Sequence, residues 1–134
     1  MSRYCYLDYL IELDTALLAK ECGSPQFKDI DVDDYHQIQT WDKLRNDKWE
    51  VGVGEAAVES MVALTQSQLH TWIRQTHDLV IEVGQLEGLY YFMASHTSDH
   101  AVFIDDKEYY DSFEEAFERG LFATLEHIKA NEES

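Results

Sequence analysis

Ser-Phe-Glu-Glu-Ala-Phe-Glu-Arg-Gly-Leu-Phe-Ala-Thr-Leu-Glu-His-Ile-Lys, residues 112–129, is the strongest helical pattern in this chain. Its apolar residues recur every three or four positions and so share one face of a helix: Phe113, Phe117, Leu121, Leu125 and Ile128. Ser112 and Glu115 match a Ser-x-x-Glu capping box, which satisfies free backbone N–H groups at a helix start. A helix with one apolar face needs a second layer to pack against. The apolar segment 79–110, just upstream, is the expected partner.

That upstream segment predicts three antiparallel strands. Residues 79–83 are β-branched and apolar, residues 85–88 suit a hairpin turn, and residues 89–95 form an aromatic-rich second strand. Residues 101–104 are the third strand, and residues 108–110 are left open as a fourth. Connections this short require antiparallel pairing.

A second capping box precedes the sheet, because Thr65 and Gln68 can each satisfy the other's backbone N–H group. The residues that follow share one helical face, which contains Leu69, Trp72 and Ile73. This pattern predicts a helix that ends near residues 75–77. The order is therefore helix, three strands, helix, with both helices on one face of the sheet. We predict a single two-layer α+β domain over residues 1–134. Double-stranded-RNA-binding domains share this element order, but element order alone carries no function.

The N-terminal part predicts one further helix, over residues 11–22, which Gly23 and Pro25 end. Its apolar face is expected to hold Leu13, Ala16, Leu17 and the stem of Lys20. Residues 24–60 have no clean period, and we interpret them as a long connecting region with short elements.

Composition narrows the function more than the motifs do. The formal net charge of −17 over 134 residues disfavours nucleic-acid phosphates and anionic membranes, and favours a basic partner or bound cations. Cys5 and Cys22 make no disulfide framework, and no stretch approaches the about 18 uncharged apolar residues that a membrane span requires. We expect a cytoplasmic protein with no nucleic-acid and no membrane partner.

Three segments resemble a group of small uncharacterised proteins of Bacteroides-type bacteria and their phages. They are residues 13–23 (LDTALLAKECG), 65–77 (TQSQLHTWIRQTH) and 110–116 (YDSFEEA). They correspond to an opening helix, a capped helix with Trp, Arg and His ahead of a strand, and a closing helix. The resemblance implies a phage-related or mobile-element origin, and no activity or site accompanies it.

Two motifs lack the context that their chemistry needs. Residues 52–57 fit the G-x-G-x-x-A dinucleotide pattern, but no βαβ unit surrounds them. An acidic run, Asp29, Asp31 and Asp33, mimics the start of an EF-hand loop. The later loop positions do not fit, because Asp34 stands where glycine is required and Thr40 where glutamate is required. A glycine turn and a solvated acidic loop are the expected structures.

Two polar groupings are similarly weak. His96 and His100 flank Asp99, but no further pair with ligand spacing accompanies them. Glu114 and Glu118 lie four positions apart at the edge of the apolar face, near the positive helix start, where we expect them in solvent. We predict no catalytic residue, no cofactor and no metal site.

Aromatic residues offer one candidate interaction surface: Tyr90, Tyr91, Tyr109, Tyr110 and Phe122. Phe122 points away from the helical stripe, and strand alternation divides the tyrosines between the two sheet faces. If helices cover one face only, the other is open and aromatic, which suggests a protein contact or a homo-oligomer. The alternative is that residues 24–60 fold across that face.

The leading hypothesis is a small, acidic, non-enzymatic protein that binds another protein. One alternative is a nucleic-acid mimic, whose carboxylates occupy the phosphate-binding groove of a DNA-binding protein. Another is an unrecognised enzyme, which requires a concave pocket that holds titratable residues with shifted pKa values.

Overall fold

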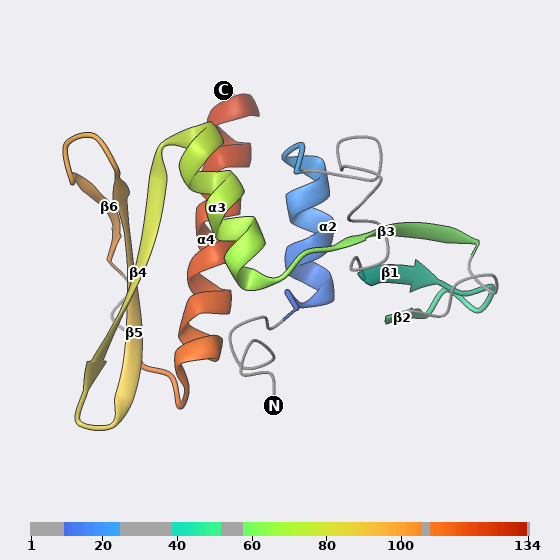
Figure 1. Cartoon of the computed structure of the whole chain (residues 1–134), viewed down its shortest axis with the longest axis horizontal. Helices are drawn as coiled ribbons and strands as arrows, with labels where there is room; N and C mark the ends of the chain where they lie inside the picture. The colour runs from blue at the N-terminus through green and yellow to red at the C-terminus, as the bar shows by residue number, and fades with distance from the viewer. Residues whose placement is uncertain (1–9, 25–38, 52–57, 106–107, 134) are drawn as a thin grey trace, which may run out of the picture.

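The helices and strands of the C-terminal part follow one another in the predicted order. The computed structural model describes residues 10–24, 39–51, 58–105 and 108–133. Its helices are α2 (Leu13–Glu21), α3 (Gln66–His77) and α4 (Phe113–Glu133) (Figure 1). One antiparallel sheet has the order β4 (Leu79–Leu86), β5 (Leu89–His96), β6 (Val102–Asp105), and the other has the order β2 (Trp49–Val51), β1 (Gln39–Lys43), β3 (Glu59–Ala63). The class is α+β, and the C-terminal part has the predicted α-β-β-β-α order behind an N-terminal helix.

Helix α4 lies at the centre of these elements. It contacts β4 and β5 on one side and both other helices elsewhere, and Leu121 and Leu125 are fully buried, as predicted. Gly120 allows this close approach, because a Cβ atom there would lie 2.7 Å from Ile81 Cγ2. Only the first residue of the predicted apolar face departs from it, since the Phe113 side chain is exposed.

Side-chain caps define where helices α3 and α4 begin. The Thr65 hydroxyl accepts a hydrogen bond from Gln68 N at 3.1 Å, and Gln68 Oε1 accepts one from Thr65 N at 2.9 Å, so this capping box is confirmed. At the start of α4, the Ser112 hydroxyl accepts a hydrogen bond from Glu115 N at 3.1 Å. These contacts satisfy backbone donors that no helical carbonyl can reach.

The predicted hairpin is also confirmed. Strands β4 and β5 pair in full register from Leu79↔His96 to Leu86↔Leu89, around a two-residue turn at Glu87 and Gly88. Both turn residues have positive φ, of 54° and 84°, which suits the twist of a tight hairpin. The possible fourth strand is reduced to one isolated bridge between Tyr90 and Tyr110.

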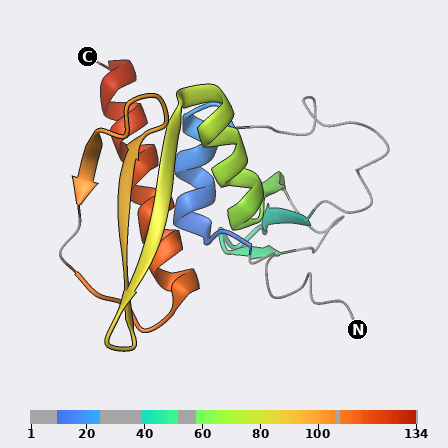
Figure 2. The ribbon, with the colours of Figure 1, turned by 60° about the vertical axis from the view of Figure 1, so that its left-hand side comes forward.

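The second sheet is the main departure from the predicted fold. Residues 24–60 were expected to be a long connecting region with short elements, yet the described residues between 39 and 63 form a three-stranded sheet, β2-β1-β3. The indole Nε1 of Trp41 donates a hydrogen bond to the carbonyl of Ile11 at 3.2 Å, and this bond ties the sheet to the start of α2. Helix α2 therefore lies between this sheet and α4 (Figures 1 and 2). Strands β1–β3 are thus far from the outer face of the first sheet.

Candidate functional site

Helix α2 packs on the core through small side chains. It buries Thr15, Ala16 and Ala19, and just beyond it the buried Cys22 thiol lies 3.5 Å from the carbonyl oxygen of Leu125 on α4. Small side chains let the two helices approach closely. The predicted apolar face placed Leu17 in the core, which is wrong, because its side chain is 37% exposed.

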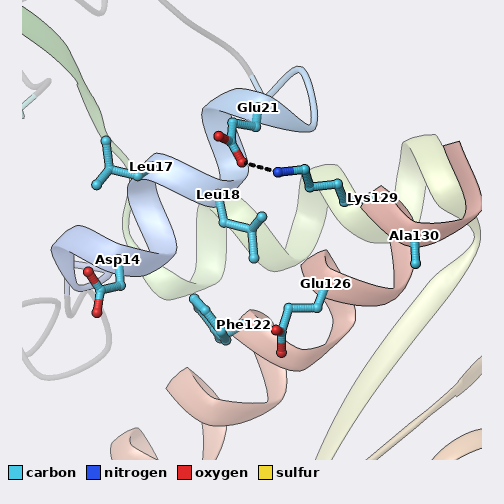
Figure 3. Close-up of a pocket in the computed structure, with 8 residues that line it drawn as sticks. All are labelled: Asp14, Leu17, Leu18, Glu21, Phe122, Glu126, Lys129 and Ala130. Carbon is cyan, nitrogen blue, oxygen red and sulfur yellow. Dashed lines mark hydrogen bonds and ion pairs between the residues drawn. The ribbon is translucent and has the colours of Figure 1, made fainter. Parts of the chain in front are cut away.

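A groove of about 530 Å³ lies between α2 and α4. Leu18 points from α2 toward α4, and Phe122 points from α4 toward α2, so that apolar side chains form its floor (Figure 3). The described residues that line it all belong to these two helices: Asp14, Leu17, Leu18, Glu21, Phe122, Glu126, Lys129 and Ala130. We call this feature the α2/α4 groove.

Carboxylates dominate the rim of the α2/α4 groove. Lys129 Nζ lies 2.8 Å from Glu21 Oε2, and this ion pair joins the C-terminal parts of the two helices (Figure 3). Asp14 and Glu126 form no ion pair within the part of the chain that the structure describes. The groove therefore has an apolar floor and a net negative rim.

One cation lies beside this floor. The guanidinium of Arg119 sits 5.7 Å from the centroid of the Phe122 ring, within the range of a cation–π contact. Phe122 is thus neither in the main core nor on a free surface, since its ring contacts Arg119 and lines the groove.

A buried carboxylate holds the N-terminal end of α2 in place. Glu118 is only 6% exposed, so the prediction that it lies in solvent is wrong. Its carboxylate accepts hydrogen bonds from Glu12 N at 2.8 Å and from Gln66 Nε2 at 3.0 Å. Gln66 Nε2 also donates to the carbonyl of Glu114 at 2.9 Å. Glu118 therefore joins the starts of α2 and α3 to α4, which positions one wall of the α2/α4 groove.

A second cavity, of about 450 Å³, lies beside this junction. Burial, and then the nearby Glu118 carboxylate, raise the pKa of Glu12 at its mouth. The described residues that line this cavity are Leu10, Glu12, Gln66, Glu114, Glu115, Glu118 and Arg119, and none of them is a serine, cysteine, histidine or lysine. The hydrogen bonds of this junction hold the starts of α2 and α3 against α4.

His70 is the other residue with a shifted pKa. Burial, and then the charge of Arg74, lower the pKa of His70 to about 4. Its neutral Nε2 accepts a hydrogen bond from Ile81 N at 3.0 Å, and its ring packs edge-on against Phe117. This histidine therefore satisfies a backbone donor of strand β4.

The five predicted aromatic residues do not form one surface. The rings of Tyr91 and Tyr109 pack against each other at 5.9 Å, whereas Tyr110 stacks on the buried Phe92. Tyr90 pairs with Tyr110 through backbone hydrogen bonds of 2.8 and 2.7 Å, so both lie on the helix side of the sheet. Strand alternation separates Tyr90 from Tyr91, and Phe122 lies in the α2/α4 groove instead.

The outer face of the first sheet is a second exposed surface. The Tyr91 ring lies across Gly84, which leaves no room for a side chain there. The exposed apolar residues of this sheet are Leu86 and Leu89, which flank the hairpin turn, and Val102, which pairs with Ser95. Strands β1 to β3 do not cover this face (Figure 2). The linings of the two described cavities do not include these residues.

The glycine pattern, the aspartate run and the histidine pair singled out in the sequence form no site among the described residues. The glycine pattern at 52–57 and the aspartates at 29, 31 and 33 lie outside the described residues. The His96 ring packs on Phe103, and Asp99 accepts a hydrogen bond from Ala101 N at 3.0 Å. Among the described residues, no three His, Cys, Asp or Glu side chains are grouped so that they could hold a metal ion. In the same residues, no helix has the length and apolar character needed to cross a bilayer.

No protein-family model, no curated protein and no solved structure matches the chain. The function therefore has to be argued from the shape and charge of the molecule itself.

Proposed function

We propose that this protein acts by binding another protein, and that the α2/α4 groove is the contact surface. The observation that supports this proposal is the combination of an apolar floor with a carboxylate rim. Leu17 is an exposed apolar residue of the groove, while Asp14 and Glu126 form no ion pair among the described residues and can pair with cationic side chains. Apolar contact supplies affinity, and charge complementarity supplies specificity and rate of association.

The overall charge favours a basic partner. A net charge of −17 creates a negative potential around the molecule, which attracts cationic proteins and repels nucleic acid. Such steering raises association rates at low salt and is screened over about 10 Å at 0.1 M salt. The groove then provides the short-range contacts that distinguish one basic protein from another.

The groove supports this role better than the outer face of the first sheet does. Two helices wall the groove, so a ligand there buries surface on more than one side. The outer face offers exposed side chains such as Leu86, but neither of the two described cavities, the α2/α4 groove and the cavity beside Glu118, includes them. Because interface energy concentrates in residues that fill pockets, the groove is the stronger candidate.

Nucleic-acid mimicry is the second candidate function, and the charge of −17 favours it. A mimic depends on the arrangement of carboxylates over a broad surface, and an apolar groove is not needed for it. The two functions therefore differ in whether binding depends on the groove floor.

The test compares two leucines that are both exposed and both replaced by aspartate. Leu17→Asp places a charge in the groove, and Leu86→Asp places the same charge on the outer face. Wild type and both variants are immobilised and exposed to lysate of the source organism at about 50 mM and about 300 mM NaCl. Circular dichroism and urea midpoints confirm that each variant is folded.

The proposal is supported if a partner, identified by mass spectrometry, is retained by wild type and Leu86→Asp but lost with Leu17→Asp. Retention by all three proteins that disappears at higher salt would favour mimicry. If wild type retains no protein at either salt concentration, protein binding is refuted.

A further inference from the structure

We infer that the α2/α4 groove binds a basic amphipathic α-helix of the partner protein. This inference rests on the proposed function and specifies its ligand. It follows from three properties of the groove: the secondary structure of its walls, the length of its apolar floor and the position of its carboxylates.

The walls favour a helix over an extended strand. A bound strand gains affinity from main-chain hydrogen bonds to a sheet edge. Both walls here are helices, α2 and α4, and helical backbone groups are satisfied within the helix. A third helix laid between them would contact both through side chains, as in ordinary helix packing.

The length of the groove sets the length of the ligand. Helix α2 has nine residues, which span about 13 Å. Asp14 and Glu21 are seven positions apart, so they lie two helical turns from each other, about 10 Å along the axis. A partner helix of two to three turns, with apolar residues at i, i+3, i+4 and i+7, would cover this floor.

Carboxylates lie on both walls. Asp14 belongs to α2 and Glu126 to α4, so a helix in the groove would have an acidic side chain on each flank. Lysine or arginine residues that border the apolar face of the ligand could pair with both. Glu21 is already bound to Lys129, and this ion pair marks the C-terminal end of the floor (Figure 3).

The charge of Arg119 provides a separate test of whether the ligand in the groove is cationic. Its guanidinium, beside the Phe122 ring, repels a cationic ligand. Arg119→Ala should therefore tighten the complex, by about threefold at low salt, since one screened like charge is removed. A ligand held by cation-accepting surfaces elsewhere would respond much less to this local change.

The experiment uses a synthetic peptide of about 11 residues, or three helical turns, that contains only leucine and lysine, with the leucines on one helical face. Its affinity for the full chain is measured by isothermal titration calorimetry. A peptide of the same composition, reordered so that no apolar face exists, is the first control. A peptide with glutamate in place of lysine is the second.

Leu17→Asp separates apolar docking from charge attraction, because it removes an apolar contact and adds a carboxylate. A complex held by charge alone would tighten, whereas a helix in the groove should bind about tenfold more weakly. Leu86→Asp adds the same charge on another surface and should change the affinity by less than about twofold. The double variant Asp14→Asn/Glu126→Gln should also weaken binding, by about tenfold.

The inference holds if the amphipathic basic peptide binds more tightly than both control peptides and if its affinity changes as stated for each variant. Binding should weaken with Leu17→Asp and with Asp14→Asn/Glu126→Gln, change little with Leu86→Asp and tighten with Arg119→Ala. It is overturned if the reordered peptide binds equally well, if Leu17→Asp tightens the complex, or if no peptide binds. It is also overturned if analytical ultracentrifugation shows a homodimer that Leu17→Asp dissociates, since a second copy would then fill the groove. A groove-dependent partner captured from lysate, without peptide binding, would leave the proposed function standing and reject only the helical ligand.

Discussion

Glu118→Ala should lower the free energy of unfolding by about 2–3 kcal/mol, which is a large effect for the substitution of one charged residue. The carboxylate accepts two hydrogen bonds, from Glu12 N at 2.8 Å and from Gln66 Nε2 at 3.0 Å. Hydrogen bonds to a charged group contribute about 1.5–3 kcal/mol each, so the gross loss is about 3–6 kcal/mol.

Two effects reduce that loss. Gln66 Nε2 keeps its second acceptor, the carbonyl of Glu114, so of the two donors only the N–H group of Glu12 is left without an acceptor among the described residues. Removing a buried carboxylate also removes the cost of its desolvation. The isosteric Glu118→Gln keeps one acceptor oxygen but turns a donor toward a donor, and should cost about 1–2 kcal/mol.

The assay is urea denaturation at pH 7, followed by tryptophan fluorescence, since the chain has three tryptophans. Trp41 reports directly on this region, because its indole is hydrogen-bonded to Ile11. Glu115→Gln is the matched control, three positions away on an exposed site, and should change stability by less than about 0.5 kcal/mol. The double variant with Gln66→Ala should show a coupling energy of about 1 kcal/mol.

A Glu118→Ala variant as stable as the Glu115→Gln control would refute this reasoning. The junction would then be no more than a solvated contact. A large loss without coupling to Gln66 would retain the role of Glu118 but assign it to the α2 contact alone.

Three further predictions follow from close contacts. Gly120→Ala should destabilise the protein by about 1 kcal/mol in urea, because its Cβ would lie 2.7 Å from Ile81 Cγ2 and this clash exceeds the gain in helix propensity. The folded-state pKa of His70 is lowered from 6.5 to about 4, so its neutral form contributes stability that is complete above about pH 6.5 and is lost as pH falls toward 4. Partial solvent contact should limit this contribution to about 1–2 kcal/mol, and urea midpoints of His70→Gln, which keeps an acceptor, should vary less over that pH range. Gly84→Ala should displace the Tyr91 ring, which near-ultraviolet circular dichroism would detect, at a cost below about 1 kcal/mol.

The parts of the fold that were predicted correctly have signals within a few residues of one another. The capping box at Thr65 and Gln68 is read across three positions, and the two-residue hairpin loop lies between two apolar strands. The stripe through Leu121 and Leu125 repeats within one helix. Each of these patterns carries its own period or cap, so no distant partner is needed to interpret it.

The second sheet was missed because its pairing is not local. Strand β1 pairs with β3 from Gln39↔Ala63 to Lys43↔Glu59, while β2 has only three residues. Such short strands show too few alternations to define a period. In addition, adjacent Met61 and Val62 are both buried, so that inward and outward positions do not alternate in the sequence.

The candidate site was predicted only in part, through Phe122. Its position off the apolar stripe of α4 is visible in the sequence, but the helix that lies beside it is distant in the chain. The same cause explains Glu118 and Leu17, whose burial and exposure were both predicted wrongly. A helical pattern shows which face is apolar, and it does not show which second helix will cover the flank.

Stability and binding should therefore be coupled in this protein. One wall of the α2/α4 groove is α2, which Glu118 holds at its start and the Glu21–Lys129 ion pair holds at its end. If α2 separates from α4, the groove no longer exists, so a ligand binds only the docked form. Such a ligand stabilises the docked form by RT ln(1 + [L]/Kd), about 2.7 kcal/mol at a hundredfold excess over Kd. A substitution at Glu118 that leaves α2 partly undocked would weaken binding by the undocked fraction although Glu118 lies outside the groove, and saturating ligand would restore the lost stability.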